Sequence, residues 1–237
     1  MKLSRLLPVL MGRGAKYYQK VLSIQPANLI AFWRLNETSG TAAVDSSPEG
    51  NNGTYTGVDL ANAAGPDGVL VPYWDGVNDY INIDSAGLDA DFDDTECTLS
   101  VWVKPVNWND GANHQIIEIQ NNVPQRLTIA KTSTADKVEF RWFGGNLDVA
   151  GITNATNAWM HFAITRSEAA NEVKLWVNGA QVSTTKVSGS ATGVSISLGL
   201  IGAYITTPAA VWKGWIANVA LWKVALTPAE ILALATV

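Results

Sequence analysis

The stretch EVKLWVNGAQVSTTKV at residues 172–187 predicts a β-hairpin. Val173, Leu175 and Val177 alternate with other residues, which is the pattern of a strand with one face buried. Asn178-Gly179 then supplies the positive φ angles that a tight two-residue turn requires, and residues 181–187 return as the second strand. Because of this hairpin, we expect further strands in the rest of the chain.

The same two-residue period recurs on both sides of this hairpin. Further strands are predicted at 97–103, 137–143, 159–166 and 213–222. Many short strands separated by turn residues indicate an all-β, two-sheet antiparallel sandwich or a barrel. Two short helices are expected at the ends: one over 15–24, and one that begins with the capping box Thr227-Pro-Ala-Glu230.

Composition fits one soluble globular domain. At 237 residues the chain can bury a sizeable core as a single sandwich. The single cysteine, Cys97, excludes an intramolecular disulfide framework and is predicted to be a buried thiol. No stretch approaches the length of a membrane span, so we expect no membrane insertion.

The first 26 residues hold five of the 16 basic residues and none of the 21 acidic ones. We therefore predict a basic N-terminal arm over residues 1–26 and one domain over residues 27–237. The arm's charges can meet an acidic surface on its own body, on a neighbouring subunit or elsewhere. Its helix has one apolar face, which either closes an end of the sandwich or grips another protein. The arm residues are Lys2, Arg5, Arg13, Lys16, Tyr17, Tyr18, Lys20, Val21 and Leu22.

Several motifs, in order, carry a family resemblance from about residue 28 to the end of the chain. They are AFWRLNETSG at 31–40, WDGVNDYI at 74–81, LSVWVKP at 99–105, WMHFA at 159–163 and GWIANV at 214–219. Together they resemble the laminin G-like, concanavalin A-like lectin/glucanase superfamily, which implies a jelly roll. The arm is similar to the lead-in of laminin G-like proteins encoded by tailed bacteriophages, which implies a virion component.

Catalysis is not expected. Glycan-cleaving jelly rolls of this superfamily resemble one another in an E-x-D-x-x-E strand that places paired carboxylates on one face. Here Glu118 is followed at the second position by Gln120, and Glu139 by Arg141. His161 lies between apolar residues of a predicted strand, which is typical of a hydrogen-bonded structural histidine. We also find no nucleotide-binding or zinc-ligand spacing.

Calcium is the one cofactor that the resemblance favours. The family often holds this ion near its first loops, against the closing strand, and Ca²⁺ prefers carboxylate, amide and carbonyl oxygens. The candidate ligands are Asp45, Asn51, Asn52, Glu37 and Asn218. The closing strand has Ala217-Asn218 where the family usually has Asp-Asp, which weakens the site. The alternative is a loop held by its own Asx hydrogen bonds.

Sugar binding would need exposed aromatic rings beside polar groups, because the apolar face of a sugar ring stacks on tryptophan. Trp108, Asn109 and Asp110 form such a loop, and Trp102 and Trp176 are candidates to line a concave sheet. The alternative for each tryptophan is packing beneath a neighbouring loop or at a subunit contact.

The sequence favours a non-enzymatic virion structural or decoration protein. It would be a homo-oligomer in an assembly on the virion surface, bound to other virion proteins or its own subunits through the arm. The alternative is an extracellular, calcium-dependent carbohydrate-binding adhesion module that takes a cell-surface glycan; a glycan-cleaving enzyme ranks third. The acidic body makes nucleic acid a poor partner.

Overall fold

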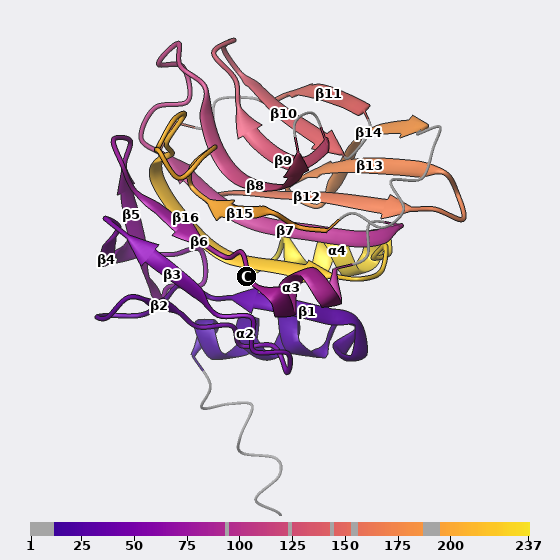
Figure 1. Cartoon of the computed structure of the whole chain (residues 1–237), viewed down its shortest axis with the longest axis horizontal. Coiled ribbons are helices and arrows are strands. Elements are labelled where there is room, and N and C mark those ends of the chain that lie inside the picture. Colours follow the sequence, from indigo (N-terminus) through magenta and orange to yellow (C-terminus); the bar gives the residue numbers. More distant parts are fainter. Residues whose placement is uncertain (1–11, 93–94, 123–124, 143–144, 153–155, 187–194) are drawn as a thin grey trace, which may run out of the picture.

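The computed structural model describes residues 12–92, 95–122, 125–142, 145–152, 156–186 and 195–237. Two antiparallel sheets of eight strands each face one another (Figure 1). Sheet A runs in the order β14 (Ala180–Lys186), β13 (Glu172–Val177), β12 (Met160–Ser167), β7 (Glu96–Pro105), β16 (Lys213–Trp222), β5 (Leu70–Asp75) and β4 (Asp59–Ala64), with β1 (Leu29–Trp33) also paired to β16.

Sheet B completes the sandwich and confirms the predicted jelly-roll architecture. Its order is β11 (Gly145–Gly151), β10 (Lys137–Trp142), β9 (Gln125–Lys131), β8 (His114–Asn122), β15 (Leu198–Ile201), β6 (Tyr80–Asn82), β3 (Gly53–Thr56) and β2 (Ala42–Ala43). The predicted hairpin is β13–β14, and its turn residues Asn178 and Gly179 have φ angles of 50° and 79°. These are the left-handed values that the Asn-Gly pair was expected to supply.

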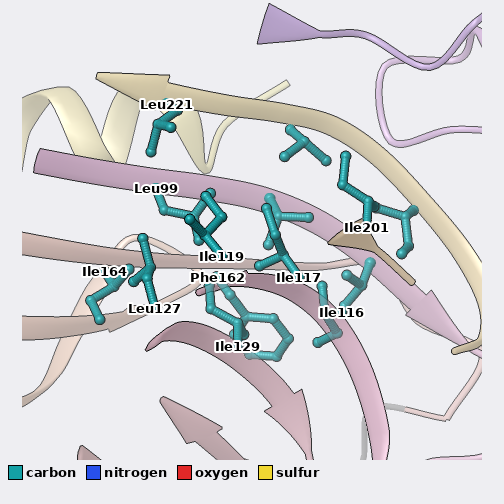
Figure 2. Packing of buried hydrophobic residues seen from close by; sticks show 14 of the residues in the cluster. Leu99, Ile116, Ile117, Ile119, Leu127, Ile129, Phe162, Ile164, Ile201 and Leu221 are labelled. Atoms are coloured by element: carbon teal, nitrogen blue, oxygen red, sulfur yellow. The ribbon is translucent and has the colours of Figure 1, made fainter. Parts of the chain in front are cut away.

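The main core lies between the sheets. Alternate residues of each strand point inward, as the sequence pattern predicted: Leu99 and Ile164 from sheet A meet Ile119 and Leu127 from sheet B (Figure 2). Cys97 belongs to this core and is buried, as predicted. His161 is also buried, and its Nε2 lies 2.8 Å from the Ser100 hydroxyl, which confirms its structural role.

Three short α-helices accompany the described strands: α2 (Arg13–Ser23), α3 (Ala86–Asp91) and α4 (Pro228–Leu234). The Thr227–Glu230 capping box is present at the start of α4. Asp89 and Asp91 lie in α3, which begins with the Ser85 side chain accepting from the Leu88 N–H at 3.0 Å. None of the described helices has the length and apolar character needed to cross a bilayer.

Helix α2 packs on the outer face of sheet A, next to α4. Tyr17 and Val21 are buried there, and Tyr18 and Leu22 pack against the same cluster. The Tyr17 hydroxyl donates to the Leu234 carbonyl at 2.9 Å. The apolar face of the helix therefore covers the chain's own sheet, which is the first of the two interpretations given above. Lys2 and Arg5 lie outside the described residues.

Candidate functional site

The outer face of sheet B contains a polar hollow of about 250 Å³. Its floor comes from strands β8, β9 and β10, and one side comes from the 202–212 segment between β15 and β16. Two backbone hydrogen bonds hold that segment against β8: the Gln115 N–H donates to Ala210 O at 2.6 Å, and the Gly202 N–H donates to Ile116 O at 2.9 Å. The lining residues are Asn113, Gln115, Arg126, Thr128, Ala130, Lys131, Glu139, Arg141, Tyr204 and Ala210.

Strand register brings the polar residues of the floor together. Glu118 of β8 lies opposite Thr128 of β9, and Thr128 lies opposite Arg141 of β10. The next row joins Gln115, Ala130 and Glu139 in the same order of strands. Because directly opposite residues of an antiparallel pair share one face, each row presents its side chains on the outer surface.

Glu118 lies beneath this hollow, where its fully buried side chain contacts three of the lining residues. Its Oε2 accepts from the Thr128 hydroxyl at 2.5 Å and from the Gln115 amide, and its Oε1 lies 3.7 Å from a guanidinium nitrogen of Arg126. Burial raises the pKa of Glu118 to about 7, against the lowering effect of the Thr128 hydrogen bond and the Arg126 charge. This carboxyl is therefore poised to change its protonation state near neutral pH.

Two arginines form the cationic wall of the hollow. The Arg126 guanidinium lies 5.3 Å from the centroid of the Tyr204 ring, and Arg141 pairs with Glu139. Burial and the like charge of Arg126 both lower the pKa of Arg141. The two guanidinium groups are thus close enough to repel one another, and an anion between them would relieve that repulsion.

The predicted sugar-binding loop lies beside the hollow, but only its acid joins the charged network. Lys131 Nζ contacts Asp110 Oδ1 at 2.5 Å and His114 Nε2 contacts Asp110 Oδ2 at 2.7 Å. Burial acts to raise the pKa of Asp110. Hydrogen bonds from Lys131, the Ala112 N–H and His114 outweigh that effect and lower the pKa to about 2. Asn109 is exposed and bonds Asp136 at 3.2 Å.

The structure corrects the prediction for all three tryptophans. Trp108 is fully buried in the core, where its ring meets Trp212 and Phe162. Trp102 and Trp176 lie on the outer face of sheet A beneath the helices, with Trp102 Nε1 donating to the Tyr17 hydroxyl at 3.0 Å. No large part of these rings remains for a sugar, so the packing alternative holds for each of them.

The side-chain oxygens of Asp45 and Asn52, two of the proposed calcium ligands, already accept hydrogen bonds. Asp45 accepts four: from the Phe32 and Ser47 N–H groups at 2.7 and 2.8 Å, and from the Ser47 hydroxyl and Asn51 N–H, both at 2.7 Å. Asn52 accepts from the Asp45 N–H at 2.8 Å. A cation and an N–H donor cannot share one lone pair, so this arrangement does not fit the ion and favours the Asx alternative.

Of the remaining three candidates, Asn51 Oδ1 accepts from the Ser85 hydroxyl at 3.5 Å, whereas Asn218 Oδ1 is buried and accepts no hydrogen bond in the described structure. Glu37 accepts from the Val44 N–H at 2.9 Å and from the Tyr55 hydroxyl at 2.7 Å. Asn218 is buried on β16, where its N–H donates to the Arg34 carbonyl at 3.2 Å. Among the described residues, no three His, Cys, Asp or Glu side chains group to hold a metal. Calcium binding stays a prediction.

The cross-strand cluster was not predicted, because Glu118 and Glu139 were each compared only with residues of the same strand. The available signal was the alternation of β10, which puts Lys137, Glu139 and Arg141 on the face opposite the core. What the sequence lacked was the register that places Arg126 and Glu118 beside that face.

Comparisons with known proteins agree on the fold. Domain 4 of AbnA, a GH43 extracellular arabinanase from Geobacillus stearothermophilus solved with arabinotriose, superposes with a TM-score of 0.61 at 18% identity, over 88% of this chain and 98% of that one. A mutant of Trypanosoma rangeli sialidase with trans-sialidase activity gives a TM-score of 0.69 at 14% identity, over 94% of this chain. This chain spans 37% of that sialidase. No curated protein sequence matches.

A family model supplies the identification. The model described as "Concanavalin A-like lectin/glucanases superfamily" (Laminin_G_3) matches residues 75–232, which include most strands of both sheets and the start of α4. This agrees with the motifs and with the observed two-sheet sandwich. The chain belongs to the concanavalin A-like lectin/glucanase superfamily.

Proposed function

We propose that this chain is a non-catalytic carbohydrate-binding domain whose ligand occupies the polar hollow on sheet B. One observation carries the proposal: an open depression of about 250 Å³ brings together guanidinium, amide, hydroxyl and carboxylate groups from three adjacent strands. Sugar hydroxyls need such a mixture of donors and acceptors. The hollow lies below the usual range for drug-sized ligands, which suits one sugar ring.

Tyr204 gives the hollow its aromatic element. Its ring is half-buried and lies against the Arg126 guanidinium. An aromatic ring beside polar groups can contact the apolar face of a sugar while the neighbouring groups bond its hydroxyls. This is the role that the sequence had assigned to tryptophans that are buried instead.

Binding without cleavage follows from the state of the two carboxyls. A glycosidase needs two of them flanking one glycosidic bond, one as acid and one as base or nucleophile. The Glu118 side chain is fully enclosed, and Glu139 is paired with Arg141. Neither is presented as a free group at the mouth of the hollow, so we propose that the raised pKa of Glu118 serves binding.

The relatives are consistent with this proposal. The arabinanase domain is nearly the same length as the matched part of this chain and was solved with an oligosaccharide. At 18% identity this likeness concerns the fold, and the ligand assigned here is argued from the hollow itself.

The test is a titration of the purified chain with a panel of neutral and acidic oligosaccharides, measured by calorimetry or on a glycan array. Tyr204→Ala should abolish binding, while Tyr73→Ala should preserve it. Tyr73 is the matched control because it is also a half-buried tyrosine, but it stacks on Trp215 in sheet A, 5.0 Å between ring centroids. Binding unaffected by Tyr204→Ala would place the ligand elsewhere.

The same panel tests the absence of catalysis. Each oligosaccharide is incubated with the chain and its products are separated by chromatography. We expect the substrates to be recovered intact. Turnover that disappears in Glu118→Gln or Glu139→Gln would overturn the non-catalytic proposal.

A role on a virion surface is our second proposal. It is supported by the basic exposed side of α2, where Arg13 and Lys16 face away from the body. If those charges attach the chain to an acidic subunit, light scattering should show an oligomer or a particle complex that the double charge reversal R13E/K16E dissolves. A chain that is monomeric both with and without the charge reversal would contradict the virion proposal and leave carbohydrate binding as the remaining proposal.

A further inference from the structure

The charges around the hollow indicate the chemical class of its ligand more closely than the volume of the hollow does. The whole chain has 21 acidic and 16 basic residues, yet three of the lining residues are Arg126, Arg141 and Lys131, against Glu139 alone among acids. Lys131 is already engaged by Asp110. The two arginines therefore decide the electrostatic character of the hollow.

Each arginine retains donors for a ligand. A guanidinium group has five N–H donors, and each of these arginines forms an ion pair with one carboxylate in the part of the chain described. Arg141 also interacts electrostatically with Glu118. The nearest nitrogen of Arg126 is 3.7 Å from Glu118, beyond ordinary hydrogen-bonding distance, and its Nε is buried without a hydrogen-bond partner. The Arg126 guanidinium is held in place mainly by charge and by the Tyr204 ring.

A second unpartnered group lies beneath the lining of the hollow. Glu118 Oε1 is buried and accepts no hydrogen bond in the described structure, while Oε2 accepts two. A buried carboxylate next to an incompletely bonded guanidinium is an unfavourable arrangement on its own. A ligand that supplies an acceptor to Arg126 would complete the bonding of that guanidinium group.

We propose that the hollow binds an acidic sugar, with the carboxylate of the ligand held between Arg126 and Arg141. The planar guanidinium fork matches a carboxylate better than a single lone pair, and charge-assisted bonds of this kind are about twice as strong as neutral ones. The inference rests on the proposed function and narrows its ligand class to glycans that carry a uronic or sialic acid.

The test compares matched ligands by calorimetry at pH 7. Glucuronate and N-acetylneuraminate are titrated alongside glucose, arabinotriose, sodium acetate and sodium sulfate. We expect the acidic sugars to bind about tenfold or more tightly than the neutral sugars. Acetate and sulfate should bind far more weakly than the acidic sugars, because they lack the ring.

Variants identify the residues. Arg141→Gln should weaken the binding of acidic sugars at least about tenfold more than it weakens the binding of neutral sugars, whereas Lys174→Gln should change neither. Lys174 is a matched control because it also pairs with a glutamate, Glu172 at 3.1 Å, on sheet A. Arg126→Gln leaves Glu118 without its cation, so if that variant misfolds, the double variant E118Q/R126Q replaces it.

The outcomes separate the two proposals. Equal binding of neutral and acidic sugars overturns the acidic-ligand inference and keeps the proposed function. Acetate or sulfate binding as tightly as the acidic sugars shows a simple anion site and also overturns the inference. If Arg141→Gln leaves the binding of acidic sugars unchanged, the ligand does not depend on Arg141, and the inference is overturned. No binding of any sugar, neutral or acidic, overturns the proposed function itself.

Discussion

The outer faces of the two sheets differ in what covers them. On sheet A, Phe32, Trp102 and Trp222 lie beneath α2 and α4 in a second apolar cluster. On sheet B, Arg126 and Arg141 line a hollow that no described helix covers. The same alternation of inward and outward residues therefore leads to a second core on one side and a polar site on the other.

This difference shows how side-chain chemistry divides the two faces. An outward-facing tryptophan in a sheet is favourable only if another element buries it, since each aromatic side chain removes a large apolar area from water. Trp102 and Trp176 met that need through the helices. Charged residues can stay on an open face and bond one another across strands. The predictions below test this division, beginning with the largest expected effect.

Deleting residues 1–24 should break the covered face. The deletion removes α2 and exposes the rings of Phe32, Trp102 and Trp222, so we expect a loss of more than about 5 kcal/mol in the free energy of unfolding, with aggregation. Denaturant unfolding followed by tryptophan fluorescence measures it. A truncated chain that remains a folded, soluble jelly roll would show that α2 is an arm and not part of the core.

Asp45→Ala tests how β1, which supplies Phe32 to the covered face, is anchored. The Asp45 carboxylate accepts four hydrogen bonds, including one from the Phe32 N–H at 2.7 Å. Its removal should cost about 4 kcal/mol, because a buried donor left without a partner costs about 1–3 kcal/mol. Thermal melts with and without chelator complete the test. We expect chelator to leave the melting temperature of the unchanged chain the same; a chelator-sensitive melt that Asp45→Ala abolishes would establish the calcium site.

Glu118→Gln should show how much the buried Glu118 carboxylate on sheet B lowers the free energy of unfolding at high pH. Burial raises the pKa of Glu118 to about 7 from its usual 4.5, so its contribution to stability is fully present below about pH 4.5 and is lost as pH rises through 7. At pH 8 the uncharged glutamine should be more stable than the wild type by roughly 3 kcal/mol.

The measurement is the difference between the two unfolding free energies from pH 5 to pH 8. Taking the difference removes the effect of His161, whose pKa burial lowers to about 3 and which acts with the opposite sign, losing stability as pH falls. A difference that is constant over this range would contradict the raised pKa of Glu118.

Tyr17→Phe should have the smallest effect and sharpens the account of the covered face. The ring stays buried, but the hydroxyl that donates to Leu234 O at 2.9 Å and accepts from Trp102 Nε1 at 3.0 Å is lost. We expect a loss of about 1 kcal/mol, since Trp102 Nε1 also reaches the Leu234 carbonyl at 3.2 Å. Urea unfolding measures it, and a loss as large as that of Tyr17→Ala would show that the hydroxyl, not the ring, fixes the helix.

The sequence by itself determined several elements of this protein. The alternation at β10 and β13, the Asn178-Gly179 turn and the Thr227 capping box are each set by neighbouring residues, because they depend on side-chain period and on local backbone preference. For the same reason the buried roles of Cys97 and His161 could be predicted from the apolar strands that contain them.

Only the tertiary structure decided what each outer face does. Residues 118, 126 and 141 lie on three different strands, and their meeting depends on cross-strand register, which no single strand encodes. Whether Trp102 is buried likewise depends on a distant segment. Its contact in α2, Tyr17, is 85 positions away in sequence, and α2 could fold back onto the sheet or extend to a partner. Packing between distant segments decides the position of such a helix, because the apolar area that it buries, and not the local sequence pattern, determines where it lies.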